Sequence, residues 1–204
     1  MPPERSDHVG PNAILQMIEA LITLSGADVC DRVCHRAGLP GIVANPPDSM
    51  IPARDALSLH RAVAAELPKP EADEIARDAG RRTGDYILAH RIPAPARVML
   101  RLLPARLAGP LLLKAISRHA WTFAGDARVT HETAAPMHLI IQDNPLAMPG
   151  CLWHLAVFET LFHRLVSSDI RVTHPACCAM DGQSCEFLFD LDRKSVRGAA
   201  VLLG

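Results

Sequence analysis

Sulfur and imidazole side chains are closely spaced near the C-terminal end of the chain, in the pattern His174-x2-Cys177-Cys178-x6-Cys185. Zinc prefers tetrahedral sulfur and nitrogen ligands, and close spacing keeps the entropic cost of closing the loop between them low. The sequence around this pattern alternates in the manner of strands on both sides. We therefore expect a metal knuckle in a closing hairpin, with His174, Cys177 and Cys185 as three of the ligands.

A fourth ligand is available from Cys151, which begins a predicted helix just after a proline-containing loop. A helix N-terminus favours the thiolate form, which is the form that binds metal. The set Cys151, His174, Cys177 and Cys185 would be a closed and therefore structural zinc site. The alternative is that these cysteines are small hydrophobic core residues. We leave out Cys178, since next to Cys177 on a strand it would face the opposite side.

A second pair of cysteines, Cys30 and Cys34, is separated by four residues on a predicted helix. The two side chains share one helical face, but no second cluster completes four ligands. Core packing is therefore favoured over metal binding at this pair. A chain with unpaired thiols and metal ligands fits a reducing compartment.

Composition favours one globular domain without a charged footprint. The chain has 204 residues, of which 49% are hydrophobic and 21% charged, and its formal net charge is -1. We expect a single ligand-binding domain at residues 11–192, an N-terminal extension at 1–10 and a C-terminal tail at 193–204. The overall charge does not indicate nucleic acid or an anionic membrane as partner. No signal peptide and no transmembrane segment is predicted, so we expect a cytoplasmic protein.

Two kinds of pattern follow each other along the chain. Apolar residues recur at helical spacing and predict helices at 11–26, 28–37, 53–66, 70–90, 97–103 and 107–119. Apolar and β-branched runs then predict strands at 122–131, 137–142, 170–174 and 186–191, with one helix at 151–166 between them. This order indicates an α+β fold in which N-terminal helices pack on a small antiparallel sheet that ends in a zinc-pinned hairpin.

Three segments carry a family resemblance: VGPNAILQMIEAL at 9–21, CLWHLAVFETLF at 151–162 and HPACCAMDGQSCEFLFDL at 174–191. Together they resemble the bacteriochlorophyll 4-vinyl reductase family, known as BchJ. Its vinyl-reductase domain is similar to the ligand domain of phenol-responsive activators, and such domains are often dimeric. In those sensors the zinc ligands match Cys151, His174, Cys177 and Cys185, with a glutamate where this chain has His174.

The resemblance implies reduction of a vinyl group on a chlorophyllide-type pigment, which needs a hydride or electron donor. The sequence contains no G-x-G-x-x-G after a strand and no cysteine set typical of an iron-sulfur cluster. We therefore favour a tetrapyrrole carrier or accessory protein in bacteriochlorophyll biosynthesis, with Mg-tetrapyrrole intermediates and other enzymes of the pathway as partners. The alternatives are a genuine divinyl-chlorophyllide reductase, and a small-ligand-sensing or structural homodimer.

A flat, apolar pigment needs an apolar wall with a few polar groups. The predicted wall is drawn from one segment and comprises Arg97, Met99, Leu103, Ile116, His119, Trp121 and Phe123. Apolar residues at helical spacing are more often plain core, and arginines are more often solvated. Axial ligands for a magnesium pigment could come from His119, His131, His138, His154 or His163.

Overall fold

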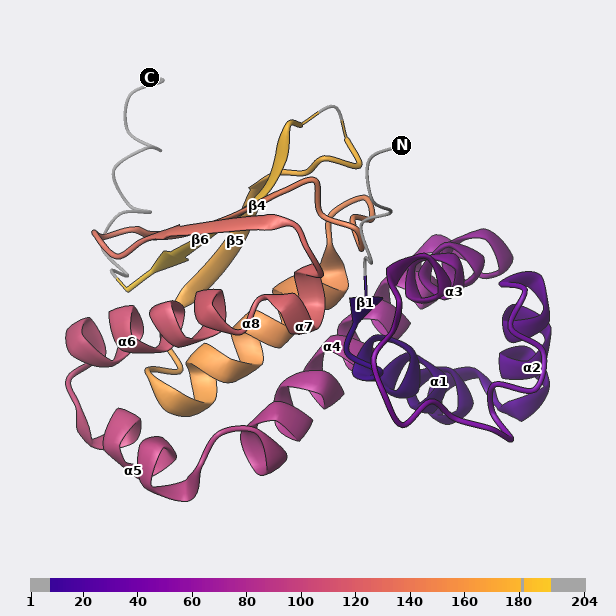
Figure 1. Cartoon of the computed structure of the whole chain (residues 1–204), viewed down its shortest axis with the longest axis horizontal. Coiled ribbons are helices and arrows are strands. Elements are labelled where there is room, and N and C mark those ends of the chain that lie inside the picture. Colours follow the sequence, from indigo (N-terminus) through magenta and orange to yellow (C-terminus); the bar gives the residue numbers. More distant parts are fainter. Residues whose placement is uncertain (1–7, 181, 192–204) are drawn as a thin grey trace, which may run out of the picture.

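The computed structural model of the chain describes residues 8–180 and 182–191 (Figure 1). Its helices are α1 (Asn12–Ser25), α2 (Ala27–Arg36), α3 (Ala53–Glu66), α4 (Lys69–His90), α5 (Ala94–Leu102), α6 (Ala105–Arg118), α7 (Trp121–Ala124) and α8 (Leu152–Leu165). Its strands are β1 (His8–Val9), β2 (Ile51–Pro52), β3 (Arg128–Glu132), β4 (Met137–Gln142), β5 (Arg171–Ala176) and β6 (Ser184–Asp190).

The main sheet has four antiparallel strands in the order β3-β4-β6-β5. One face is apolar, because alternate residues of the two central strands are buried, including Leu139 opposite Phe187 and Met137 opposite Phe189. Helices α6 and α8 lie along this face (Figure 1), and Phe158 of α8 packs edge-to-face on Phe187. The sheet is therefore covered by helices on its buried side.

The first three helices form a separate group of elements beside the sheet, closed by the short β1–β2 ladder (Figure 1). The 22-residue helix α4 links the two parts, because it packs on α1 and on α8. A Cβ at Gly80 would lie 2.4 Å from the carbonyl oxygen of Trp153, and one at Gly84 would lie 2.7 Å from Cβ of Thr160. Glycine at these positions lets α4 approach α8 closely, which positions the start of α8.

The α+β class predicted from sequence is confirmed, and so is the antiparallel hairpin of β5 and β6. One predicted strand, at residues 122–131, is wrong in its first half. Trp121–Ala124 forms helix α7, in which the amide of Ala124 donates to the carbonyl of Ala120, and β3 begins only at Arg128. The local turn after α6 outweighs the strand propensity of the aromatic and β-branched residues there.

No helix in the described part of the chain is long and apolar enough to cross a bilayer. The predicted tail at 193–204 lies outside the described residues, as does most of the predicted extension at 1–10. The single domain at 11–192 stays a prediction.

Candidate metal centre and adjoining cavity

Three separate elements bring Cys151, His174, Cys177 and Cys185 together at the turn end of the β5–β6 hairpin. One ligand atom from each lies within 4.8 Å of all the others. Cys151, Cys177 and Cys185 are buried and His174 is half-buried. The group therefore joins the start of α8 to both strands of the hairpin.

The three sulfurs have the spacing of a tetrahedral site. The Sγ of Cys151 lies 3.6 Å from that of Cys177 and 3.6 Å from that of Cys185, and the remaining pair is 4.0 Å apart. A tetrahedron with zinc–sulfur bonds of about 2.3 Å has edges of about 3.8 Å. The donor set and its spacing thus fit zinc.

Local backbone geometry directs Cys151 toward the other thiols. Cys151 caps α8 in the left-handed region, with φ of 42°, and follows Gly150, whose φ is 77°. The positive φ of a non-glycine residue is uncommon and costs conformational energy that the surrounding structure must offset. The Cys177 thiol donates to the carbonyl of Met148 in the same loop, which ties the hairpin to the loop before α8.

His174 is oriented as a metal ligand usually is. The pairing of β5 with β6 shifts between Thr173 and Ala176, and the imidazole of His174 stacks on Phe187 with the ring centroids 4.5 Å apart. Its Nδ1 lies 2.7 Å from the carbonyl oxygen of Glu186, which can only accept, so Nδ1 carries the proton. Nε2 is then unprotonated, and it is buried without a hydrogen-bond partner. A lone pair in this state is available to a cation.

The three thiols of this group differ in pKa. The Cys151 thiol donates to Cys185, which lowers the pKa of Cys185 to about 5 and raises that of Cys151. Burial raises the pKa of Cys177. The protein alone therefore holds one thiolate in this group, and binding of a divalent cation would release protons from the other thiols.

Cys178 also belongs to this neighbourhood, which sequence reasoning missed. Its Sγ lies 3.2 Å from that of Cys185, because β5 has ended and the residue sits in the turn and not on a strand. The alternation rule that placed it on the opposite face does not apply in a turn. Cys178 contacts Cys185 but does not belong to the four residues whose ligand atoms all lie within 4.8 Å of one another.

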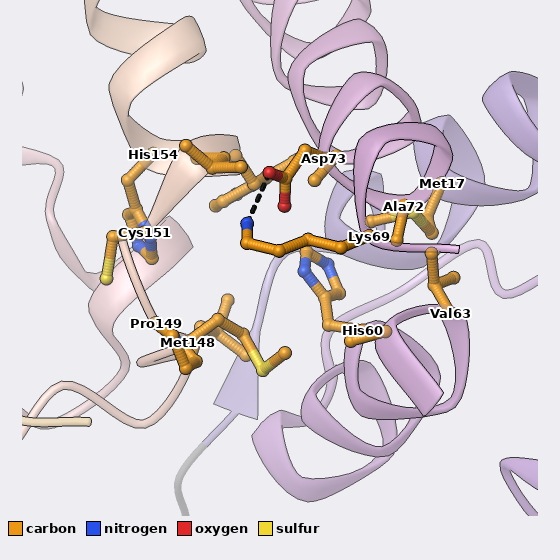
Figure 2. A pocket seen from close by; sticks show the side chains of 15 residues that line it. Met17, His60, Val63, Lys69, Ala72, Asp73, Met148, Pro149, Cys151 and His154 are labelled. Atoms are coloured by element: carbon orange, nitrogen blue, oxygen red, sulfur yellow. Dashed lines mark hydrogen bonds and ion pairs between the residues drawn. The ribbon is translucent and has the colours of Figure 1, made fainter. Parts of the chain in front are cut away.

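A cavity of about 280 Å³ adjoins Cys151 (Figure 2). It lies between α1, α3, the first turns of α4 and the start of α8, with Cys151 and His154 at one end and Met17 and Val63 toward the other. Lys69 and Asp73, which form an ion pair, line its exposed side. The cavity is close in size to the smallest ligand pockets, at about 300 Å³.

Two of the residues that line this cavity carry buried polar atoms without a partner. Nε2 of His154 and Nε1 of Trp153 are both buried and have no hydrogen-bond partner. Burial lowers the pKa of His154 to about 3, so its ring is neutral. His60 is also neutral, with its pKa lowered to about 4 by burial and its Nε2 donating to the carbonyl of Ala13. The residues around the cavity thus include one unpartnered acceptor and one unpartnered donor in an apolar setting.

The predicted pigment wall lies elsewhere. None of its seven residues lines the cavity, and Met99 and Leu103 instead border a shallow depression on α5. Phe123 packs on His154 and Phe158. The other members are the half-buried Arg97, the buried Ile116 and the exposed His119 and Trp121.

Three of the other four candidate axial histidines already have hydrogen-bond partners in the protein. Nδ1 of His119 is bonded to the carbonyl of Ala115, Nδ1 of His131 to the hydroxyl of Ser117, and Nε2 of His163 to the carbonyl of Ile170. His138 lies 3.2 Å from a carboxylate oxygen of Glu186. Of the five, His154 lines the cavity.

The arrangement of helices and four-stranded sheet is that of the H-NOX proteins. The chain resembles an Fe(II) unliganded H-NOX protein mutant from K. algicida with a TM-score of 0.62 and 12% identity, covering 93% of this chain and 100% of that one. It resembles an H-NOX protein from S. oneidensis, solved in the Fe(II)NO ligation state, with a TM-score of 0.56 and 11% identity over 90% and 99% of the two chains. The protein therefore has an H-NOX-like α+β fold.

The chain belongs to the family of the bacteriochlorophyll synthase 23 kDa chain. It is 40% identical to the protein of that name from Cereibacter sphaeroides over 191 residues, which is 91% of each chain. It is also 40% identical to the one from Rhodobacter capsulatus, over 92% of this chain and 89% of that one. No protein-family model matches the chain.

Proposed function

We propose that this protein binds a tetrapyrrole intermediate of bacteriochlorophyll biosynthesis and serves as a carrier or accessory protein of that pathway. Two independent likenesses support this. The relatives at 40% identity are named as bacteriochlorophyll synthase chains, and the fold neighbours include H-NOX structures concerned with heme and porphyrin distortion. A pathway with poorly soluble, flat intermediates benefits from a protein that shields them.

The observation that carries the proposal is the cavity at His154. Its walls are mostly apolar, while Nε2 of His154 and Nε1 of Trp153 lack partners. In the proposal, His154 offers its lone pair to the magnesium or to a polar edge group of the pigment. Lys69 is exposed and can exchange Asp73 for a pigment carboxylate. The cavity admits one edge of the macrocycle, and the rest extends toward the exposed side.

We also propose that Cys151, His174, Cys177 and Cys185 bind a structural zinc. The support is the sulfur spacing and the orphaned Nε2 of His174. A four-ligand site leaves no position open for substrate, so the metal would stabilise the loop that borders the cavity. Metal analysis of the purified protein should give about one equivalent of zinc; no bound metal in protein purified without chelator would contradict the assignment.

The decisive experiment is titration with a Mg-tetrapyrrole, followed by its absorbance. His154→Ala should weaken binding about tenfold or more, since a buried polar interaction of about 1.4 kcal/mol is lost. The matched control is His119→Ala, which removes another candidate axial histidine from the wall predicted from the sequence. If His119→Ala weakens binding and His154→Ala does not, the pigment binds at that wall instead. If the parent protein does not bind the pigment, the carrier proposal is wrong.

Incubation with a divinyl pigment and NADPH tests the reductase alternative. The carrier proposal expects a spectral binding change without formation of the ethyl product. Turnover by the purified protein would establish a reductase instead. Neither binding nor turnover would favour the third alternative, a ligand-sensing or structural homodimer.

A further inference from the structure

One stretch of the chain, from Tyr86 to Gly125, has a charge of one sign. It carries six of the 21 Lys and Arg residues and none of the 22 Asp and Glu residues: Arg91, Arg97, Arg101, Arg106, Lys114 and Arg118. No ion pair joins any of the six to another residue in the described part of the chain. The net charge of -1 conceals this local excess, because the acidic residues lie in the remaining segments.

The same stretch concentrates the exposed large hydrophobic residues. Among the described residues, six of the ten exposed ones lie here: Val98, Met99, Leu102, Leu107, Leu111 and Trp121. Leu102 is 80% exposed, which is the highest value of the ten. Apolar side chains interleaved with cations are typical of a helix that lies in a membrane interface.

Helices α5 and α6 present these residues outward. On α5, Leu100 alone is buried, while Val98, Met99 and Leu102 border an open, shallow depression. On α6, Leu107 and Leu111 are exposed at a spacing of four residues, so they share one face of the helix. Helix α5 lies below α6, at the lower edge of the view, with α6 between it and the sheet (Figure 1).

Charge selects among the possible occupants of this surface. A symmetric second copy would bring two sets of like charges together, which opposes association. The depression on α5 is open, whereas a partner helix usually lies in a groove with walls on both sides. An anionic bilayer satisfies both features, since its headgroups attract the cations and its interface accepts the aliphatic side chains.

We propose that α5 and α6 form a peripheral docking surface for anionic membranes. The surface would hold the protein at the bilayer through Leu102, Leu107 and their apolar neighbours, with Arg106 and Lys114 contacting headgroups. This inference does not depend on pigment binding, because it uses residues outside the cavity.

Flotation of the full chain with lipid vesicles tests the proposal. The protein should float with vesicles containing phosphatidylglycerol and phosphatidylcholine, and much less with phosphatidylcholine alone, and added salt should weaken the binding. The double variant Leu102→Glu/Leu107→Glu should reduce binding about tenfold or more. Its matched control, Ile22→Glu/Leu24→Glu, adds the same charge at exposed positions of α1 and should bind as the parent does.

A second variant separates charge from apolar contact. Arg106→Glu/Lys114→Glu leaves every exposed leucine in place and should remove the preference for phosphatidylglycerol. Equal binding to both vesicle types, or equal loss in the α1 control, would overturn the proposal. Absence of vesicle binding together with a change from dimer to monomer in Leu102→Glu/Leu107→Glu would assign the surface to a second copy instead.

Discussion

Two groups of buried cysteines in this protein have similar sulfur spacing but differ in thiol pKa and in the number of possible metal ligands nearby. The sulfurs of Cys30 and Cys34 on α2 lie 3.9 Å apart, close to the spacing found between Cys151 and Cys177. Burial raises the pKa of Cys30 and raises that of Cys34 to about 12, so both remain protonated thiols. In the described chain, the group that gathers three or more possible metal ligands is the one at Cys151.

The difference shows what turns buried thiols into a ligand set. The α2 pair comes from one helix, and no third ligand among the described residues joins it, so it has the properties of core residues. The C-terminal group adds His174 and a thiol from a different element, and the pKa of Cys185 is lowered to about 5. Convergence of separate elements, and not burial itself, distinguishes the two groups.

Removing one thiol from each group should give the largest contrast. Cys185→Ala should abolish zinc binding and lower the free energy of unfolding by about 4 kcal/mol or more, as loss of a structural metal does. Cys34→Ala should keep the metal and cost about 1 kcal/mol, because it removes only a small core group. Metal analysis and chemical denaturation measure both. Equal losses of stability would show that the C-terminal group is also plain core.

The helices that surround the α2 pair should respond to pH more than to metal. His60 on α3 is neutral in the folded protein, with a pKa lowered by burial from 6.5 to about 4. The unfolded chain binds a proton below about pH 6.5 and the folded one does not until about pH 4, so stability is full above 6.5 and falls as pH drops through this window. The loss reaches about 3 kcal/mol.

His60→Gln should remove about half of the loss of stability between pH 7 and pH 4 in denaturation experiments, because His154, whose pKa is lowered to about 3, contributes in the same direction. The glutamine can still donate to the carbonyl of Ala13, so stability at pH 7 should change less than in a truncation. An unchanged slope in the variant would show that another group causes the pH dependence.

The contact of α4 with α8 should affect metal binding by the cysteine group at Cys151 and should not affect the cysteine pair on α2. A Cβ at Gly80 would meet the backbone of Trp153, so Gly80→Ala should cost about 1–3 kcal/mol and weaken metal binding by displacing the start of α8. Gly109→Ala is the matched control, because its Cβ would meet the flexible end of Met137. Thermal melts and a zinc competition assay distinguish them. Full metal affinity in Gly80→Ala would contradict the coupling.

The smallest effect is expected at Cys178. If His174 is the fourth ligand, Cys178→Ala should keep one zinc and cost less than about 1 kcal/mol, whereas His174→Ala should lose the metal. The reverse result would show that Cys178, and not His174, is the fourth ligand. Zinc content with denaturation of both variants decides between them.

Much of the fold follows from local sequence. The helix at 53–66 and the strand at 137–142 match their predicted bounds, because apolar periodicity and the flanking proline, aspartate and asparagine residues act within a few residues. Three of the proposed ligands, His174, Cys177 and Cys185, are also close to one another in the sequence. A short local pattern was sufficient to predict that they would be neighbours.

Tertiary structure alone decided the rest. Cys151 was predicted as the fourth ligand, and the packing of α4 on α8 brings it to Cys177 across 26 residues. His60 and His154 meet at one cavity through the packing of α3, α4 and α8, which no pattern in the sequence predicted. Cys178 approaches Cys185 because β5 ends at Ala176, so strand alternation does not apply to Cys177 and Cys178. Such contacts form when segments distant in the sequence bury apolar surface against each other. The spacing of residues within one segment does not predict which segments will pack together. The sequence by itself determined the elements and their chemistry, and packing determined which of them meet.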